Sequence, residues 1–431
     1  MLRRSTRRAE RVSELARRAF LHRSGAAAIA CMCPAALLSG TARADDRFDL
    51  VILGGEVIDP SQALRAPRDI GIRRGRIAAV EASISVDRSA QLLDASGKLV
   101  VPGLIDMHAH VYPQASALGL PADELVPYSA TTTYVSAGDA GANNFSAFKH
   151  YIIAQSRSRI LAFVHISTIG LAGFPVGEEL NADYLDVEAA ARTVAENADV
   201  ALGVKVRISK NVVGANGFEP LKRAVAAAER AGGGARVMCH IGDAPGDLAQ
   251  LLELLRPGDI LTHAYSGAGN NTVQDGKVLP AALEAKRRGV IIDVGHGGGS
   301  FDYTVAEPAI AQGLVPDTIS SDIHAVSGNT PGMPYLPWVM SKFLNLGFSL
   351  EEVVAMTTIN PARLVGRIEK LGTLQVGAPA DVSILELVQA PVTFVDTRKN
   401  TRQGKRWLKP VHTVRAGRPF GRPYPTPFTF P

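Results

Sequence analysis

Six residues that can bind a metal or carry a proton stand at the ends of short apolar segments. A spacing of two residues places the side chains of His108 and His110 on the same face of a strand, where both imidazoles can chelate one cation. Such a pair is weak evidence by itself, but the other four residues also follow apolar segments, as catalytic groups do in parallel α/β folds. Imidazole and carboxylate ligands suit Zn²⁺, with Mn²⁺ or Co²⁺ as alternatives. The six residues are His108, His110, Lys205, His240, His263 and Asp322.

A metal held by these residues would perform hydrolytic chemistry. A bound divalent cation lowers the pKa of water from 15.7 to about 7, which provides hydroxide at neutral pH. Asp322 is the candidate catalytic residue, because a carboxylate beside the metal can take the proton of the water and pass it to the leaving group. A purely structural ligand role is the alternative for Asp322. The set therefore predicts hydrolysis by a metal-bound hydroxide.

Candidate substrate-binding residues lie beside the predicted ligands. Arg207 follows Lys205 by two residues and so shares its face, where a guanidinium can grip a substrate carboxylate bidentately. Alternatively, Arg207 pairs with Asp139 or with a modified Lys205. Tyr112 can donate to a carbonyl oxygen or simply pack, and His296 can line the pocket or support it. Gly297 and Gly298 can present backbone N–H groups to an anion, or form an ordinary turn.

The elements that must position these residues alternate between short apolar strands and Ala-rich helices. Eight apolar segments alternate with helical segments across residues 101–371, which predicts a (β/α)₈ TIM barrel. A doubly wound sheet is the alternative, but no G-x-G-x-x-G motif follows the first strand. The carboxyl ends of all strands meet at one face of a barrel, so we expect the six residues to converge there. The predicted helices are 187–197, 220–231, 248–255, 279–288 and 350–356.

Strands without intervening helices flank the predicted barrel on both sides. Short alternating segments between Gly, Pro and Asp turns favour strands. We expect residues 45–100 and 372–420 to form one small β-sandwich domain together, with an extended tail at 421–431. The predicted strands are 48–57, 70–80 with a hairpin turn at Arg74-Gly75, 91–100, 381–387 and 412–416.

Residues 1–44 carry the excess positive charge of the chain. The net formal charge is +5, but this leader has nine arginines and two glutamates, so the remainder has 37 basic and 39 acidic residues. Nucleic-acid binding by the mature protein is therefore not expected. A small-molecule substrate is expected instead, and homo-oligomer formation is left open. No later segment reaches the ~20 apolar residues that a membrane-spanning helix needs.

The leader has the features of an export signal. The segment 17–21, with two arginines followed by Ala, Phe and Leu, resembles the twin-arginine motif, and residues 42–44 give an A-x-A cleavage signal. We expect a twin-arginine-type signal peptide at 1–44, the export machinery as partner of the precursor, and a periplasmic or secreted mature protein. A disordered basic N-terminus and a lipoprotein signal ending at Cys31 are the alternatives. Cys239 alone remains after cleavage, so no internal disulfide is expected.

The metal-ligand motifs resemble those of the amidohydrolase superfamily. The matching features are residues 102–110, then Lys205, His240, His263 and Asp322 in the expected order, and segments 358–362, 372–374, 377 and 380–381 after the barrel. The resemblance implies that His108, His110 and Asp322 hold one metal and that His240 and His263 hold the other. It also implies that Lys205 bridges the two metals as a carbamate formed with CO₂.

Within that superfamily, the chain looks like the amidohydrolase/deacetylase metallohydrolases, which are related to dihydroorotases and D-aminoacylases. The residues that suggest this are 111–112, 137–141, 205–207 and 295–298. The resemblance implies attack by a metal-bridging hydroxide on the carbonyl carbon of an amide or ester. It further implies deacylation of a small N- or O-acylated carboxylic acid. A cyclic amidase of the dihydroorotase or hydantoinase kind is the first alternative. A catalytically inactive barrel that binds a metal or ligand is the second.

Overall fold

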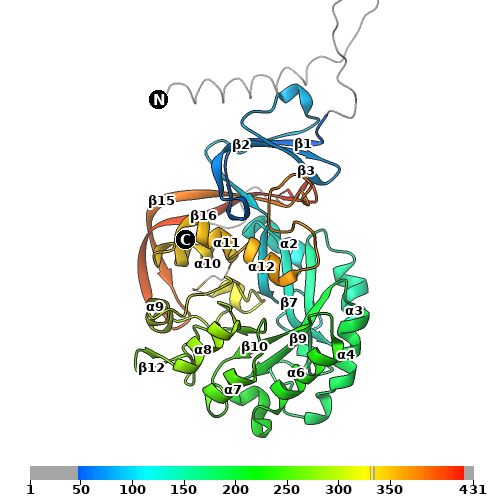
Figure 1. Cartoon of the computed structure of the whole chain (residues 1–431), viewed down its shortest axis with the longest axis vertical. Helices are drawn as coiled ribbons and strands as arrows, with labels where there is room; N and C mark the ends of the chain where they lie inside the picture. Colours follow the sequence, from blue (N-terminus) through cyan, green and yellow to red (C-terminus); the bar gives the residue numbers. More distant parts are fainter. Residues whose placement is uncertain (1–46, 331, 333–334, 422–431) are drawn as a thin grey trace, which may run out of the picture. The chain divides into compact units, whose positions relative to one another are not determined.

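The computed structural model describes most of the chain (Figure 1). The chain divides into two units, Met1–Asp45 and Asp46–Pro431, and the first unit lies outside the described residues. The predicted signal peptide 1–44 and residues 422–431 of the predicted tail therefore lie outside them as well. The described residues are 47–330, 332 and 335–421.

The second unit is built around a curled parallel sheet. Its order is β14-β11-β10-β9-β8-β7-β6, so strands that follow one another in the chain are neighbours in the sheet. Residues 318–323 join its two edges, because Asp293 forms a parallel bridge with Thr318 and Ala109 forms one with Ile323. This closure confirms the predicted (β/α)₈ barrel. The strands are β6 (Leu104–Ala109), β7 (Thr131–Gly141), β8 (Arg159–His165), β9 (Ala201–Ile208), β10 (Arg236–Ile241), β11 (Ile260–Thr262) and β14 (Ile291–Ile292).

Helices cover the outside of the barrel strands (Figure 1). In α6, Leu221, Ala224 and Ala228 recur at helical spacing and are all buried, which places one apolar face of this helix on the strands. This periodicity allowed five helices to be predicted. They are α4 (Val187–Glu196), α6 (Glu219–Ala231), α7 (Leu248–Leu254), α8 (Pro280–Arg288) and α11 (Leu350–Ala355).

Six other α-helices of the described residues were not predicted. Every residue of α10 from Leu336 to Leu344 is buried, the polar Ser341 and Lys342 included, so this helix has no exposed polar face. None of the helices in the described part of the chain is both long and apolar enough to cross a membrane. The unpredicted α-helices are α2 (Ala122–Ser129), α3 (Phe145–Phe148), α5 (Lys210–Val213), α9 (Tyr303–Ala311), α10 (Leu336–Asn345) and α12 (Ile359–Val365).

A mixed sheet combines strands from both ends of the described chain, drawn in blue and in orange to red in Figure 1. Its order is β17-β16-β15-β5-β1-β2-β3, and β4 pairs with β1. The predicted hairpin turn lies between β2 and β3, where Arg74 and Gly75 both have positive φ (51° and 73°), as a type I′ turn requires. The strands are β1 (Leu50–Asp59), β2 (Leu64–Arg73), β3 (Arg76–Glu81), β4 (Leu92–Asp94), β5 (Leu99–Pro102), β15 (Val382–Val395), β16 (Thr401–Arg415) and β17 (Arg418–Pro419).

Three strand predictions in this sheet need correction. The predicted strand 91–100 is two strands, β4 and β5, because the chain turns at Gly97, whose φ is 71°. β15 and β16 extend well beyond the predicted segments, since their hairpin packs on α10, where Leu408 N–H donates to Ser341 Oγ at 2.8 Å. A separate two-stranded sheet joins β12 (Val273–Gln274) to β13 (Lys277–Val278).

Candidate metal centre

Three buried side chains converge at the carboxyl end of the barrel strands. Asp322 Oδ1 lies 3.1 Å from His110 Nε2 and 3.3 Å from His108 Nε2. His108, His110 and Asp322 are 1%, 5% and 7% exposed. One ligand atom from each residue lies within 4.8 Å of the other two, so the three atoms can share one cation.

Neighbouring residues fix which nitrogen of each imidazole faces this point. His108 Nδ1 lies 2.8 Å from Thr262 Oγ1, and that hydroxyl donates to Asp293 Oδ2 at 2.7 Å. The hydroxyl must therefore accept the Nδ1–H of His108. His110 Nδ1 likewise lies 2.6 Å from Asp139 Oδ1. Both rings thus place Nε2 toward Asp322 and leave this nitrogen as the one that would bind a metal.

The other three predicted ligands lie beside this group. Lys205 Nζ is 3.4 Å from His108 Nε2, and the ring centroids of His240 and His263 are 4.3 Å apart. His263 Nδ1 donates to the carbonyl of Gly295 at 2.6 Å, while its Nε2 is buried and has no hydrogen-bond partner among the described residues. A cation would satisfy that nitrogen, so the donor set fits a metal.

Burial and neighbouring charges set the protonation of the site. Burial lowers the pKa of Lys205 to about 8 and that of His263 to about 4. Burial also disfavours charge on His110, but the Asp139 carboxylate outweighs it and raises the pKa of His110 to about 9. Despite its burial, Asp322 has a pKa well below its usual range, because His108 and His110 stabilise the carboxylate. Asp322 is therefore ionised at neutral pH.

The backbone is strained at two of the ligand positions. His263 and Asp322 have φ values of 65° and 48°, in the left-handed region that residues other than glycine rarely adopt. Such strain persists where the surrounding structure enforces it and is common at functional sites. Gly297 leaves room for the carboxylate, because a Cβ atom at this position would lie 2.3 Å from Asp322 Oδ2.

A cavity of about 300 Å³ opens over the metal-binding group. Of the predicted substrate-binding residues, Arg207 and Gly298 line it, whereas Gly297 underlies Asp322. Sequence reasoning did not identify the apolar part of the wall. The full lining is His108, His110, Leu118, Leu171, Phe174, Lys205, Arg207, His240, Gly298, Gly299, Ser300, Asp322 and His324.

The structure places neither Tyr112 nor His296 in the wall of this cavity. The ring of Tyr112 stacks on Phe148, with ring centroids 4.5 Å apart. His296 is fully buried, and its Nε2 lies 2.7 Å from the Nζ of Lys342, a buried lysine that sequence reasoning also missed. Their expected substrate contacts are therefore replaced by packing and by a buried hydrogen bond.

Arg207 has a carboxylate partner that was not among the expected alternatives. Its Nη1 lies 3.0 Å from Glu178 Oε1, rather than beside Asp139 or Lys205. Burial disfavours the charge of Glu178, but the charge of Arg207 outweighs burial and the pKa falls to about 2. Glu178 and Arg207 therefore form a buried ion pair at the edge of the cavity.

Glu178 also belongs to a second group with metal-like spacing, together with His165 and Glu179. The N–H of Ser167 donates to His165 Nδ1 at 3.0 Å, so the proton of the neutral ring sits on Nε2, which donates to Glu178 at 3.2 Å. No lone pair of His165 is then available to a metal. Arg207 already supplies the positive charge here, so we assign an ion-pair role to this group.

Comparison with known proteins agrees with this geometry. The model of the amidohydrolase family matches residues 99–418. The chain is 35% identical over 342 residues to a deacetylase of Agrobacterium fabrum, and the match covers 79% of this chain and 83% of that protein.

Two solved structures are also similar to this one. One is described as a dihydroorotase, with 32% identity and a TM-score of 0.80 over 86% of this chain and 97% of that chain. The other is described as an adenine deaminase, with 29% identity and a TM-score of 0.79 over 86% and 99%. The extent of the family match and of the deacetylase match shows that the chain belongs to the amidohydrolase family.

Proposed function

We propose that this amidohydrolase-family metal hydrolase deacylates a small N- or O-acylated carboxylic acid. The observation that carries the proposal is the convergence of His108 Nε2, His110 Nε2 and Asp322 Oδ1 below a cavity that Arg207 lines. The similarity to a deacetylase over most of the length of both proteins favours acyl transfer to water.

The site fits one or two divalent metals. His108, His110 and Asp322 would hold the first, and His263 Nε2 together with His240 would hold the second. Zn²⁺ suits these ligands, with Mn²⁺ or Co²⁺ as alternatives. When bound, such a metal lowers the pKa of water and polarises a carbonyl oxygen.

We further propose that Lys205 carries a carbamate between the two metal positions. Only a neutral amine adds to CO₂, with loss of one proton, and burial lowers the pKa of Lys205 to about 8. The carbamate would replace a cationic ammonium by an anionic oxygen ligand. The 3.4 Å approach of Nζ to His108 Nε2 supports this role, because a cationic Lys205 would repel a metal held by His108.

Asp322 is proposed to move the proton. Its low pKa keeps it ionised, so it can accept a proton from the attacking water and then donate it to the leaving nitrogen or oxygen. A Cβ atom at Gly297 would lie 2.3 Å from Oδ2, so the glycine leaves room for this carboxylate oxygen.

The cavity selects a small acid. Nη1 of Arg207 donates to Glu178, and the other N–H groups of the guanidinium would bind the substrate carboxylate. Leu118, Leu171 and Phe174 give the wall an apolar part that suits a hydrocarbon substituent. A volume of about 300 Å³ limits the substrate to a compact molecule.

A substrate screen tests the proposal. The Zn²⁺-loaded protein is incubated with N-acetyl amino acids, O-acetyl hydroxy acids and the matching amides without a carboxylate, and acetate release is measured. We expect release from the acids and little from the uncharged controls. Ring opening of dihydroorotate or a hydantoin without deacylation would favour the cyclic amidase alternative, which the similarity to a dihydroorotase structure supports. No turnover with metal bound would favour the inactive-barrel alternative.

We also propose that the mature protein works in the periplasm or outside the cell. The proposal rests on residues 17–21 and on the A-x-A sequence at 42–44. Cell fractionation tests it: replacement of Arg17 and Arg18 by lysine should retain the precursor in the cytoplasm. Equal export of the double variant would contradict it.

A further inference from the structure

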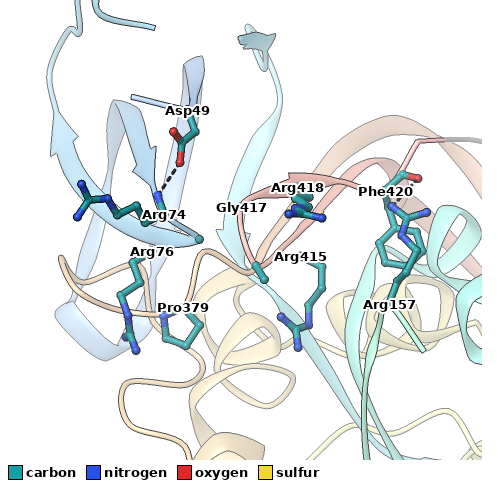
Figure 2. Close-up of a pocket in the computed structure, with 11 residues that line it drawn as sticks. Asp49, Arg74, Arg76, Arg157, Pro379, Arg415, Gly417, Arg418 and Phe420 are labelled. Carbon is teal, nitrogen blue, oxygen red and sulfur yellow. Dashed lines mark hydrogen bonds between the residues drawn. The ribbon is translucent and has the colours of Figure 1, made fainter. Parts of the chain in front are cut away.

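A larger cavity lies at the other end of the barrel strands from the metal-binding group. Its volume is about 790 Å³ (Figure 2). Arg157 in its wall precedes β8, whereas His165 ends that strand, and seven strand residues span roughly 23 Å. A ligand in this cavity cannot touch the proposed reacting groups, so the inference does not rest on the proposed reaction.

Two tight turns meet in the wall of this cavity. One joins β2 to β3 through Gly75, and the other joins β16 to β17 through Gly417, with φ values of 73° and 77°. A Cβ atom at Gly75 would lie 3.0 Å from the carbonyl oxygen of Ala416, so the backbones approach closely. Each turn carries arginines on both sides of its glycine, and all four arginines line the cavity. They are Arg74 and Arg76 in the first turn, and Arg415 and Arg418 in the second.

The wall of this cavity is strongly cationic. Arg157 joins the four arginines of the turns, of which Arg415 pairs with Asp381 at 3.4 Å. Among the described residues, Asp49 is the only acidic one that lines the cavity. Asp49 Oδ2 accepts the backbone N–H of Arg74 at 2.5 Å. Within the described ranges, Arg76, Arg157 and Arg418 form no ion pair with a carboxylate. Clefts lined by charge of one sign focus the field and concentrate counter-ions.

Neutral groups hold two of these guanidinium groups in place. Arg76 Nη1 donates to the carbonyl of Gly377 at 2.7 Å. The guanidinium carbon of Arg157 lies 4.1 Å from the ring centroid of Phe420, and the two side chains lie together in Figure 2. These contacts order the side chains without neutralising them, which reduces the entropy lost when a ligand binds.

We propose that this cavity binds a small oxyanion with at least two negative charges, of the pyrophosphate or phosphate-ester class. Arginine binds phosphate oxygens bidentately, and several arginines in one concave wall can neutralise several charges of one ligand. The phosphate can belong to a free small molecule or to a lipid headgroup. The concave shape and the volume of about 790 Å³ favour the free molecule.

Isothermal titration of the full mature chain with inorganic pyrophosphate at low ionic strength tests the proposal. We expect saturable binding to one site and a loss of affinity of about tenfold or more in the R76Q/R418Q variant. Arg192→Gln is the matched control, because Arg192 is exposed on α4, outside the cavity, and forms no ion pair within the described ranges. It should bind pyrophosphate as the wild type does.

Three results would overturn the proposal. They are the absence of saturable pyrophosphate binding to the wild type, unchanged affinity in R76Q/R418Q, and an equal loss in the Arg192→Gln control. A parallel arm measures co-sedimentation with phosphatidylglycerol vesicles. Binding to vesicles without binding to free pyrophosphate would assign the site to lipid and contradict the free-ligand proposal.

Discussion

His110 Nδ1 lies 2.6 Å from Asp139 Oδ1, and both side chains are almost completely buried, at 5% and 0% exposure. This contact orients the imidazole so that its other nitrogen faces Asp322. Asp139 lies in β7 and His110 follows β6, so residues from two neighbouring barrel strands together position one candidate metal ligand.

Asp139→Asn should weaken metal binding by about 10- to 100-fold, because the amide no longer fixes the tautomer and basicity of His110. Competition titration with a chromophoric chelator measures the affinity for Zn²⁺. Asp199→Asn is the control, since Asp199 lies on the surface with its side chain 61% exposed. Equal Zn²⁺ affinity of Asp139→Asn and the wild type would show that the contact does not support a metal ligand.

Asp322→Asn should lower kcat for the substrate found in the screen by about 10²- to 10⁴-fold, since the amide cannot accept the proton. Circular dichroism and metal content are measured on the same sample, because Asp322 is also a proposed ligand. Turnover at the wild-type rate would refute the proposed proton transfer.

Glu178→Gln should destabilise the protein at neutral pH, because it leaves the mostly buried Arg207 without its charged partner. Breaking a buried ion pair of this kind lowers the free energy of unfolding by about 3–5 kcal/mol. The pKa of Glu178 falls from 4.5 in the unfolded chain to about 2 in the folded state. Its contribution is therefore complete above the unfolded pKa and is lost as the pH falls toward the folded one.

The pH dependence of thermal unfolding checks this ion pair. The difference in stability between the wild type and Glu178→Gln should stay constant above about pH 5 and become smaller at lower pH. Glu188→Gln is the control, since the side chain of Glu188 is 70% exposed. A difference that is independent of pH down to about pH 2 would contradict the assignment of the pair.

Gly297→Ala should be destabilising by about 1–2 kcal/mol and should reduce metal content. The alanine would have to adopt a φ of 54°, and its Cβ would lie 2.3 Å from Asp322 Oδ2. Gly299→Ala is the matched control for stability, because a Cβ at Gly299 meets no atom within 4 Å. Similar melting temperatures for the two variants would show that Asp322 does not need the space above Gly297.

The sequence predicted the six candidate ligands because each lies in or just after a short apolar segment, and in a barrel the ends of such segments meet at one face. His108, Lys205 and Asp322 are examples, and all three line the cavity. Amphipathic helices such as α6 were predicted for a related reason, since burial of one face imposes a period on the sequence.

The parts that could not be predicted depend on long-range contacts or on very short elements. Glu178 lies outside any strand or helix, so nothing local indicated its ion pair with Arg207. His296 was expected in the pocket. The strand that precedes it, β14, has only two residues, too few for the alternation of side chains to indicate that His296 faces Lys342. In α10 the residues from Leu336 to Leu344 are all buried, the polar Ser341 and Lys342 included, and this burial depends on long-range contacts.

Metal analysis of the purified protein tests the central claim most directly. After dialysis against Zn²⁺ and removal of free metal, the wild type should retain at least one equivalent per chain, and a correctly folded H108N/H110N variant should retain little. Equal metal content in the two proteins, or full turnover by a metal-free wild type, would contradict the assignment of this cluster as a catalytic metal centre.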